Sequence, residues 1–206
     1  MAKAKTGKGK SSKKSPPGAR SSKAIIVEHV DESLFSPLTE GERAAALRLL
    51  LDDERARAMA KVGRYRISCV EPLVVKPPHP LQGRRLARAV LYDYASERCV
   101  EATVDLERGE VAELTTTTAQ PLLSLDEQLH TIQVALGDDR VRGGIRPDDS
   151  ALSVLLYWSR RPSELAYRRR SAAVVFGSAE APRPSLVAVV DLSDGVVTEV
   201  VPAEQW

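Results

Sequence analysis

The sequence predicts an α+β protein of two tandem domains, each with one helix packed on a four-stranded antiparallel sheet, preceded by a disordered basic N-terminal tail. Three observations predict this fold: a repeated hairpin, a repeated helix start and a charge imbalance along the chain. The hairpin segments Val104–Leu114 and Val190–Val200 align without a gap, and internal repetition is strong evidence of architecture. The identical positions are Val104/Val190, Asp105/Asp191, Leu106/Leu192, Gly109/Gly195, Val111/Val197 and Glu113/Glu199.

Each copy has the pattern of a β-hairpin, in which alternating apolar and polar residues flank a short turn. Gly109 and Gly195 sit where the turn favours a positive φ. Because side chains alternate along a strand, the apolar positions of each incoming strand predict one buried stripe. The same alternation places Asp105, Asp191 and the two repeated glutamates on the outward phase, as polar cross-strand pairs. The buried stripes are Val100, Ala102, Val104 and Leu106, and Leu186, Ala188, Val190 and Leu192.

The helix start is also repeated. Thr39 with Glu42, and Ser124 with Glu127, each form a capping-box pattern in which two side chains satisfy free backbone N–H groups. Apolar residues at helical spacing follow each box and predict the buried face, and Gly63 and Gly137 are placed to end the helices. The predicted buried faces are Leu47, Leu50, Leu51, Ala58 and Val62, and Leu125, Leu129, Ile132 and Leu136.

Four strand-like runs follow each helix, separated by proline, glycine or short polar links. An antiparallel meander with one covering helix follows from this order. The predicted strands are Arg64–Lys76, Leu86–Tyr94, Arg98–Leu106 and Glu110–Thr117, then Ala151–Trp158, Ser171–Gly177, Ser185–Leu192 and Val196–Val201.

The predicted domain boundaries follow from the repeat. A disordered tail covers residues 1–23, because this stretch is rich in Lys, Gly, Ser and Pro and has little apolar surface to bury. A linker or arm covers residues 24–35. The first domain covers residues 36–120 and the second covers residues 121–206, each of a size that can bury a modest core.

The formal net charge of +2 hides a split between tail and body. Residues 1–23 contain eight basic residues and no acidic ones, which leaves 22 basic and 28 acidic residues, a net charge of −6, in residues 24–206. Such a tail favours phosphates and could contact nucleic acid or another anion, but it lacks aromatic residues for stacking. A solubilising leader fits equally well. The candidate contacts are Lys3, Lys5, Lys8, Lys10, Lys13 and Lys14.

The sequence also bears on location. The tail has no apolar run long enough for a secretory signal and no amphipathic, Arg-rich pattern of a mitochondrial one. No stretch reaches transmembrane length, so we expect no membrane partner. Cys69 and Cys99 fall in strands that do not neighbour each other in the meander, which predicts two free, buried thiols in a reducing, cytoplasmic compartment.

Two sets of short segments carry a resemblance to a known family. The first set is Ser36-Pro37-Leu38-Thr39, Arg64–Pro72, Arg85–Tyr92, Val104-Asp105-Leu106 and Gly109; the second is Val141–Ile145, Asp148-Asp149-Ser150 and Trp158-Ser159. In order and spacing they resemble the second and third N-terminal domains of copper amine oxidases. The resemblance implies a cystatin-like fold for both domains. It implies no catalytic residue, because the chemistry of that family is carried by a separate β-sandwich.

Departures from the family indicate that the chain is not an amine oxidase by itself. The family builds its quinone cofactor from a tyrosine that follows an asparagine, and this sequence contains no asparagine. The copper site needs three histidines, two of them one residue apart. Here His29, His79 and His130 are widely spaced, so we expect no cofactor and no metal site.

Other catalytic patterns are absent too, so we assign no catalytic residue. The adjacent acidic pairs Asp126-Glu127 and Asp138-Asp139 are better explained as a cap and a solvated helix end. One cluster of arginines beside two aromatic residues is a candidate surface for an acidic partner, although an Arg-rich hairpin facing water explains it as well. The candidate residues are Trp158, Arg160, Arg161, Tyr167, Arg168 and Arg169.

These observations predict a non-catalytic binding or assembly module that contacts a protein partner or a second copy of itself, through an open sheet face or an edge strand. One alternative is an accessory chain that docks on a separately encoded amine oxidase catalytic chain. A second alternative is association with nucleic acid through the basic tail.

Overall fold

The computed structural model describes residues 31–59, 64–159, 161–164 and 166–206. The predicted disorder of residues 1–23 lies outside this range, as does most of the predicted arm. Residues Asp31–Trp206 form one compact unit. They contain two four-stranded antiparallel sheets with strand orders β1-β2-β3-β4 and β5-β6-β7-β8. The predicted α+β fold is therefore confirmed.

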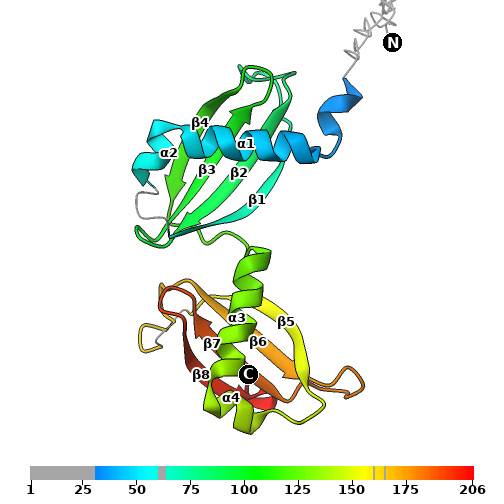
Figure 1. Ribbon diagram of the computed structural model, residues 1–206, viewed down its shortest axis with the longest axis vertical. Helices are drawn as coiled ribbons and strands as arrows, with labels where there is room; N and C mark the ends of the chain where they lie inside the picture. The colour runs from blue at the N-terminus through cyan, green and yellow to red at the C-terminus, as the bar shows by residue number, and fades with distance from the viewer. Residues whose placement is uncertain (1–30, 60–63, 160, 165) are drawn as a thin grey trace, which may run out of the picture. The chain divides into compact units, whose positions relative to one another are not determined.

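The first repeat places one long helix across its own sheet (Figure 1). A short 3-10 helix precedes it in the segment that we had expected to be an arm. The elements are η1 (Glu32–Phe35), α1 (Glu40–Asp52), α2 (Glu54–Met59), β1 (Tyr65–Leu73), β2 (Leu86–Asp93), β3 (Arg98–Asp105) and β4 (Glu110–Thr117).

The second repeat has the same arrangement, and Figure 1 shows its long helix crossing the second sheet. Its elements are α3 (Leu125–Gly137), α4 (Asp139–Gly144), β5 (Ser150–Tyr157), β6 (Ser171–Gly177), β7 (Leu186–Asp191), β8 (Val196–Pro202) and η2 (Ala203–Gln205). The first strand of the chain is shorter than predicted, because it ends at Leu73 rather than Lys76. The other strands begin and end within one residue of their predicted bounds.

Each sheet has its own hydrophobic core on the side that its helix covers. Val100, Ala102 and Val104 belong to the first core, with Leu106 packed against it. The corresponding stripe, Leu186, Ala188, Val190 and Leu192, belongs to the second core. Both predicted stripes are thus confirmed, and the two repeats bury equivalent faces.

The two β-hairpin turns are nearly identical. Gly109 and Gly195 both have φ of 67°. Asp105 accepts hydrogen bonds from two turn N–H groups at 3.1 and 3.0 Å, and Asp191 does the same at 2.8 and 3.2 Å. The predicted outward position of these aspartates is wrong: both are buried. Burial is tolerated because the turn and an arginine described below satisfy the carboxylates.

The first long helix follows the prediction at its start and departs from it at its end. The Thr39–Glu42 capping box is formed, but Asp53 ends α1 and begins a second short helix. Leu50 is buried as predicted, whereas Ala58 is exposed. Val62 and Gly63, which we had assigned to the end of this helix, lie outside the described residues.

The predicted buried face of α3 is wrong for its three leucines, whereas Ile132 packs against the second core as predicted. The Ser124–Glu127 capping box is formed, but the side chains that face the sheet are Glu127, Thr131 and Ala135. The predicted core residues Leu125, Leu129 and Leu136 are 69%, 52% and 42% exposed. The buried face contains small and polar side chains because Glu127 has an ionic partner inside the second repeat.

The cysteines lie in β1 and β3, which are not neighbours, and both are free. Cys99 is buried as predicted, but Cys69 is only partly buried. Burial raises the pKa of both thiols. In the described part of the chain, the helices are too short or too polar to cross a membrane.

Candidate functional site: a groove lined by both tryptophans

An arginine before the second strand of each sheet holds the start of the long helix. Arg85 pairs with Glu42 of the first capping box at 2.8 Å, and Arg170 pairs with Glu127 of the second at 2.6 Å. Each guanidinium also donates to backbone carbonyls of the segment that enters the helix. This shared contact fixes the long helix across the sheet, since one side chain ties strand, helix and entering loop together.

The preceding arginine in each repeat holds the hairpin turn. Arg84 pairs with Asp105 at 2.8 Å, and Arg169 pairs with Asp191 at 2.9 Å. Arg169 also pairs with Asp194 at 2.6 Å. The two adjacent arginines of each repeat thus serve two different structural contacts, and the same division of roles occurs twice.

We call each pair of an arginine and a capping-box glutamate a helix clamp. The second clamp, Arg170 with Glu127, is buried, and the first, Arg85 with Glu42, is partly exposed. The side chains of Arg170 and Glu127 are 0% and 2% exposed, against 15% and 27% for Arg85 and Glu42. Tyr94 donates a hydrogen bond to Glu127 at 2.5 Å. The guanidinium carbon of Arg170 lies 4.6 Å from the centre of the Tyr92 ring, within the range of a cation–π contact.

Burial alone would raise the pKa of Glu127, but its hydrogen bonds and charge interaction with Arg170 outweigh burial and lower it. Burial, followed by the hydrogen bond to Glu127, raises the pKa of Tyr94. Glu127 therefore stays ionised, so this cluster holds a permanent ion pair rather than a proton donor. We assign it a structural role.

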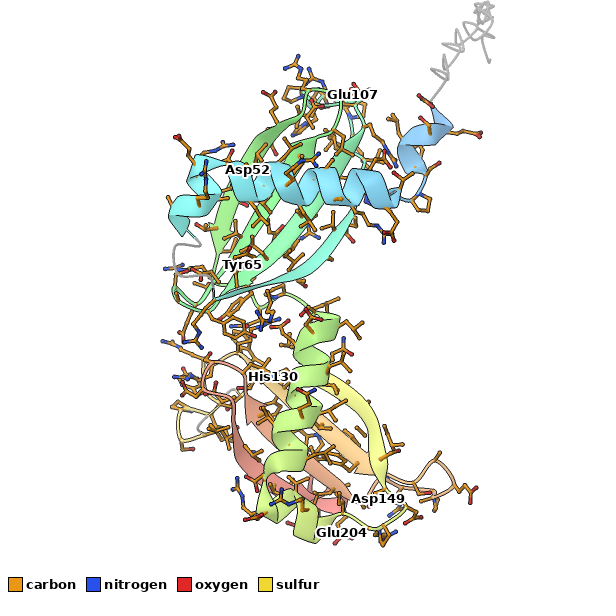
Figure 2. All side chains as sticks on the ribbon, in the orientation of Figure 1. Asp52, Tyr65, Glu107, His130, Asp149 and Glu204 are labelled. Carbon is orange, nitrogen blue, oxygen red and sulfur yellow. The ribbon has the colours of Figure 1, made fainter. Side chains whose placement is uncertain are left out.

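A groove of about 420 Å³ lies in the second repeat and is lined by residues from the end of β5 and the loop after it, from β8 and from the C-terminal segment. Glu204, labelled in Figure 2, belongs to η2 and precedes the last two groove residues. We call this cavity the tryptophan groove because both tryptophans of the chain line it. Its lining residues are Tyr157, Trp158, Ser159, Arg161, Glu164, Glu199, Gln205 and Trp206.

Three aromatic side chains form the apolar part of the tryptophan groove. The rings of Tyr157 and Trp206 are in contact, with centroids 5.1 Å apart and planes inclined at 44°. Trp158 and Trp206 are each 50% exposed. Half-exposed indole rings held by neighbouring structure are available to a ligand or partner at low entropic cost.

Two carboxylates form the polar part. Glu164 accepts hydrogen bonds from the Ser159 hydroxyl at 2.5 Å and from the Tyr157 hydroxyl at 3.1 Å. The Ser159 hydrogen bond lowers the pKa of Glu164, while burial and the Glu164 contact raise the pKa of Tyr157. Glu199 is exposed. Among the described residues it makes no salt bridge.

The structure separates the residues that the sequence grouped as a candidate surface. Trp158 and Arg161 line the groove. The Arg168 guanidinium lies over the Tyr167 ring at 5.2 Å, and Arg169 is engaged by Asp191 and Asp194. Arg160 lies outside the described residues, as do the six candidate lysines of the tail.

Sequence reasoning missed six groove residues. Tyr157, Ser159 and Glu164 lie in the same stretch as the predicted Trp158 and Arg161, whereas Glu199, Gln205 and Trp206 come from a distant part of the chain. It also missed Arg85 and Arg170. A signal for these arginines exists: they stand the same number of positions after Glu42 and Glu127, so extending the repeat upstream would have paired them.

Metal and catalytic sites were not predicted, and the described residues contain no group of three or more His, Cys, Asp and Glu side chains placed to hold a metal ion. His79 lies 3.5 Å from Glu113 at the surface of the first repeat. His130 lies on α3, as Figure 2 labels it, on an exposed position. Within the described residues, the tryptophan groove is the place where both half-exposed tryptophans and two carboxylates come together.

Comparison with known proteins supports the fold. A copper-containing benzylamine oxidase from Hansenula polymorpha is similar in structure over 82% of this chain, with a TM-score of 0.54 and 12% sequence identity. The chain spans 30% of the length of that oxidase. The C-terminal domain of Bacillus megaterium YpeB matches 82% of this chain and 64% of its own, at 13% identity and a TM-score of 0.25. No protein-family model and no curated protein matches the sequence.

Proposed function

We propose that the chain is a non-catalytic protein-binding or assembly module, built from two domains of the type that stand second and third in copper amine oxidases. The structural similarity to a benzylamine oxidase supports the fold. The distribution of exposed apolar side chains supports binding through the second repeat.

That distribution is strongly uneven. Of the eleven large apolar side chains that are exposed among the described residues, nine belong to the second repeat. Exposed apolar side chains that gather on a surface mark sites of protein contact, and the two tryptophans among these nine residues line one groove. Those nine residues are Leu122, Leu125, Leu129, Leu136, Leu152, Leu155, Trp158, Val196 and Trp206.

The test compares two double variants of the full chain. Trp158→Ser with Trp206→Ser removes the aromatic surface, and Phe35→Ser with Val74→Ser removes the two exposed apolar side chains outside the second repeat. Sedimentation velocity measures self-association, and quantitative mass spectrometry after cross-linked capture measures bound proteins. We expect loss of the self-associated or captured species in the tryptophan variant alone.

Two outcomes would refute the proposal. One is a wild-type chain that stays monomeric at all concentrations and captures no protein above the background of an unrelated bait. The other is a tryptophan variant that keeps every species of the wild type while circular dichroism shows it folded.

A second candidate is an accessory chain of a separately encoded amine oxidase, which the similarity to part of an oxidase favours. It predicts that the partner captured by the full chain is a catalytic oxidase chain, and that the purified complex oxidises benzylamine whereas the chain alone does not. A captured set without any oxidase would remove this candidate.

Association of the basic tail with nucleic acid stays a prediction. It is tested by comparing the salt-sensitive DNA retention of the full chain with that of a chain lacking residues 1–23.

A further inference from the structure

We propose that the tryptophan groove binds an alkylammonium group, the chemistry shared by a lysine side chain and a quaternary ammonium ligand. This inference rests on the proposed function, since it names what the binding surface recognises. The evidence for it is the set of aromatic rings and the two carboxylates that line the groove.

The aromatic rings provide the first half of the recognition. An ammonium ion is attracted to the face of Trp and Tyr rings, and Trp attracts it most strongly. Tyr157, Trp158 and Trp206 all line the same groove. Because both tryptophans are half exposed, the ring surface is accessible without opening the fold. A neutral apolar ligand would gain the same contact area but not the attraction to charge.

The carboxylates provide the second half. Glu199 is exposed and lines the groove, so its carboxylate faces the position of a bound cation. Glu164 is held in place by the hydroxyls of Ser159 and Tyr157. Both carboxylates also line a second, smaller cavity of about 270 Å³. A cation in the groove would thus meet two acidic groups beside aromatic faces.

Arg161 is the one basic side chain among the described residues that line the groove, and it opposes a cationic ligand only weakly. Its guanidinium lies 3.4 Å from Glu164, and its side chain is 83% exposed. Ion pairs at such exposure contribute little and rearrange readily. Among the described lining residues, two carboxylates thus stand against one guanidinium.

Tryptophan fluorescence tests the inference directly, because the chain has two tryptophans and both line the groove. The full chain is titrated with choline, with its neutral isostere 3,3-dimethylbutan-1-ol, and with sodium chloride at matched ionic strength. We expect a saturable change in emission with choline and not with the isostere or the salt. No saturable change with choline, or an equal one with the isostere, would overturn the inference, provided that Nα-acetyl-lysine amide also fails to bind.

The two sources of the ammonium group are separated by a second titration with Nα-acetyl-lysine amide. Tighter binding of this probe than of choline assigns the groove to lysine side chains, and the reverse assigns it to quaternary ammonium ligands. Either result supports the inference.

Single variants test the assigned charges. Glu199→Gln is expected to weaken choline binding about twofold to fivefold, and Arg161→Gln to strengthen it by a similar factor, as expected for exposed charges. The control is Glu113→Gln, since Glu113 occupies the repeated position in the first repeat and lies outside the groove. Equal affinities for all three variants would refute the assigned charges. If the tryptophan variant loses protein capture but the wild-type chain binds neither choline nor Nα-acetyl-lysine amide, this inference is refuted and the proposed function stands.

Discussion

The two repeats share their internal contacts and differ on their surfaces. Both have a capping box held by an arginine and a hairpin turn held by the preceding arginine. The open face of the first sheet is polar, because Arg88 bridges Glu71 and Glu101 across three strands. The edge strand β5 of the second sheet carries no charged residue and exposes Leu152 and Leu155.

This comparison separates the residues that specify the fold from those that specify binding. Contacts that recur in both copies are needed wherever this helix-over-sheet unit forms. Features found in one copy, such as the tryptophan groove, are not required by the helix-over-sheet unit itself, and we propose that binding resides there. Four predictions test whether the division holds, from the largest expected effect to the smallest.

The sharpest test is to remove the helix clamp from each repeat in turn. Arg170→Met leaves Glu127 as a buried, uncompensated charge and should lower the free energy of unfolding by about 3–5 kcal/mol. Arg85→Met should cost clearly less, because Glu42 keeps access to water. Urea unfolding monitored by circular dichroism measures both, and equal losses would show that the burial difference has no energetic weight.

Substitutions in the buried stripes of the two hairpins should lower stability by similar amounts. Val104 and Val190 are both 0% exposed, so Val104→Asp and Val190→Asp each bury an unpaired carboxylate and should cost about 3 kcal/mol or more. Thermal melts of the two variants provide the measurement. A variant that melts like the wild type would contradict the equivalence of the two cores.

Substituting the glycine of either hairpin turn should lower stability by a smaller amount, equal in the two repeats. Gly109 and Gly195 have the same positive φ, and alanine is strained in that conformation. Gly109→Ala and Gly195→Ala should each destabilise by about 1 kcal/mol. Losses that differ by more than the precision of the chemical denaturation curves would mean that the turns are not equivalent.

The smallest expected effect is the loss of stability at acidic pH. Hydrogen bonds from Arg85 and from the Thr39 backbone lower the pKa of Glu42 from 4.5 to about 2. The stabilisation by Glu42 is thus complete above pH 4.5 and is lost as the pH falls towards 2. The stability difference between wild type and Glu42→Gln, followed by urea unfolding at several pH values, should shrink across that window. A difference that stays constant would contradict the assigned linkage.

Much of the fold could be predicted from local patterns. The hairpins follow from alternation around Gly109 and Gly195, and the helix starts follow from the two capping boxes. The buried face of α3 could not be predicted in this way. A polar Glu127 in the interior requires Arg170, which is 43 positions away, and no local period reveals such a partner. The tryptophan groove could not be predicted for the same reason, since its lining residues from the end of β5, from β8 and from the C-terminal segment come together only in the folded chain.

The buried clamp links the two repeats. Arg170 of the second repeat contacts Tyr92 of the first, and Glu127 accepts a hydrogen bond from Tyr94. If either repeat unfolded alone, the other would lose these contacts and expose the side chains that make them. Each copy therefore raises the cost of melting its neighbour, and calorimetry of the full chain should record a single cooperative transition rather than two separate ones.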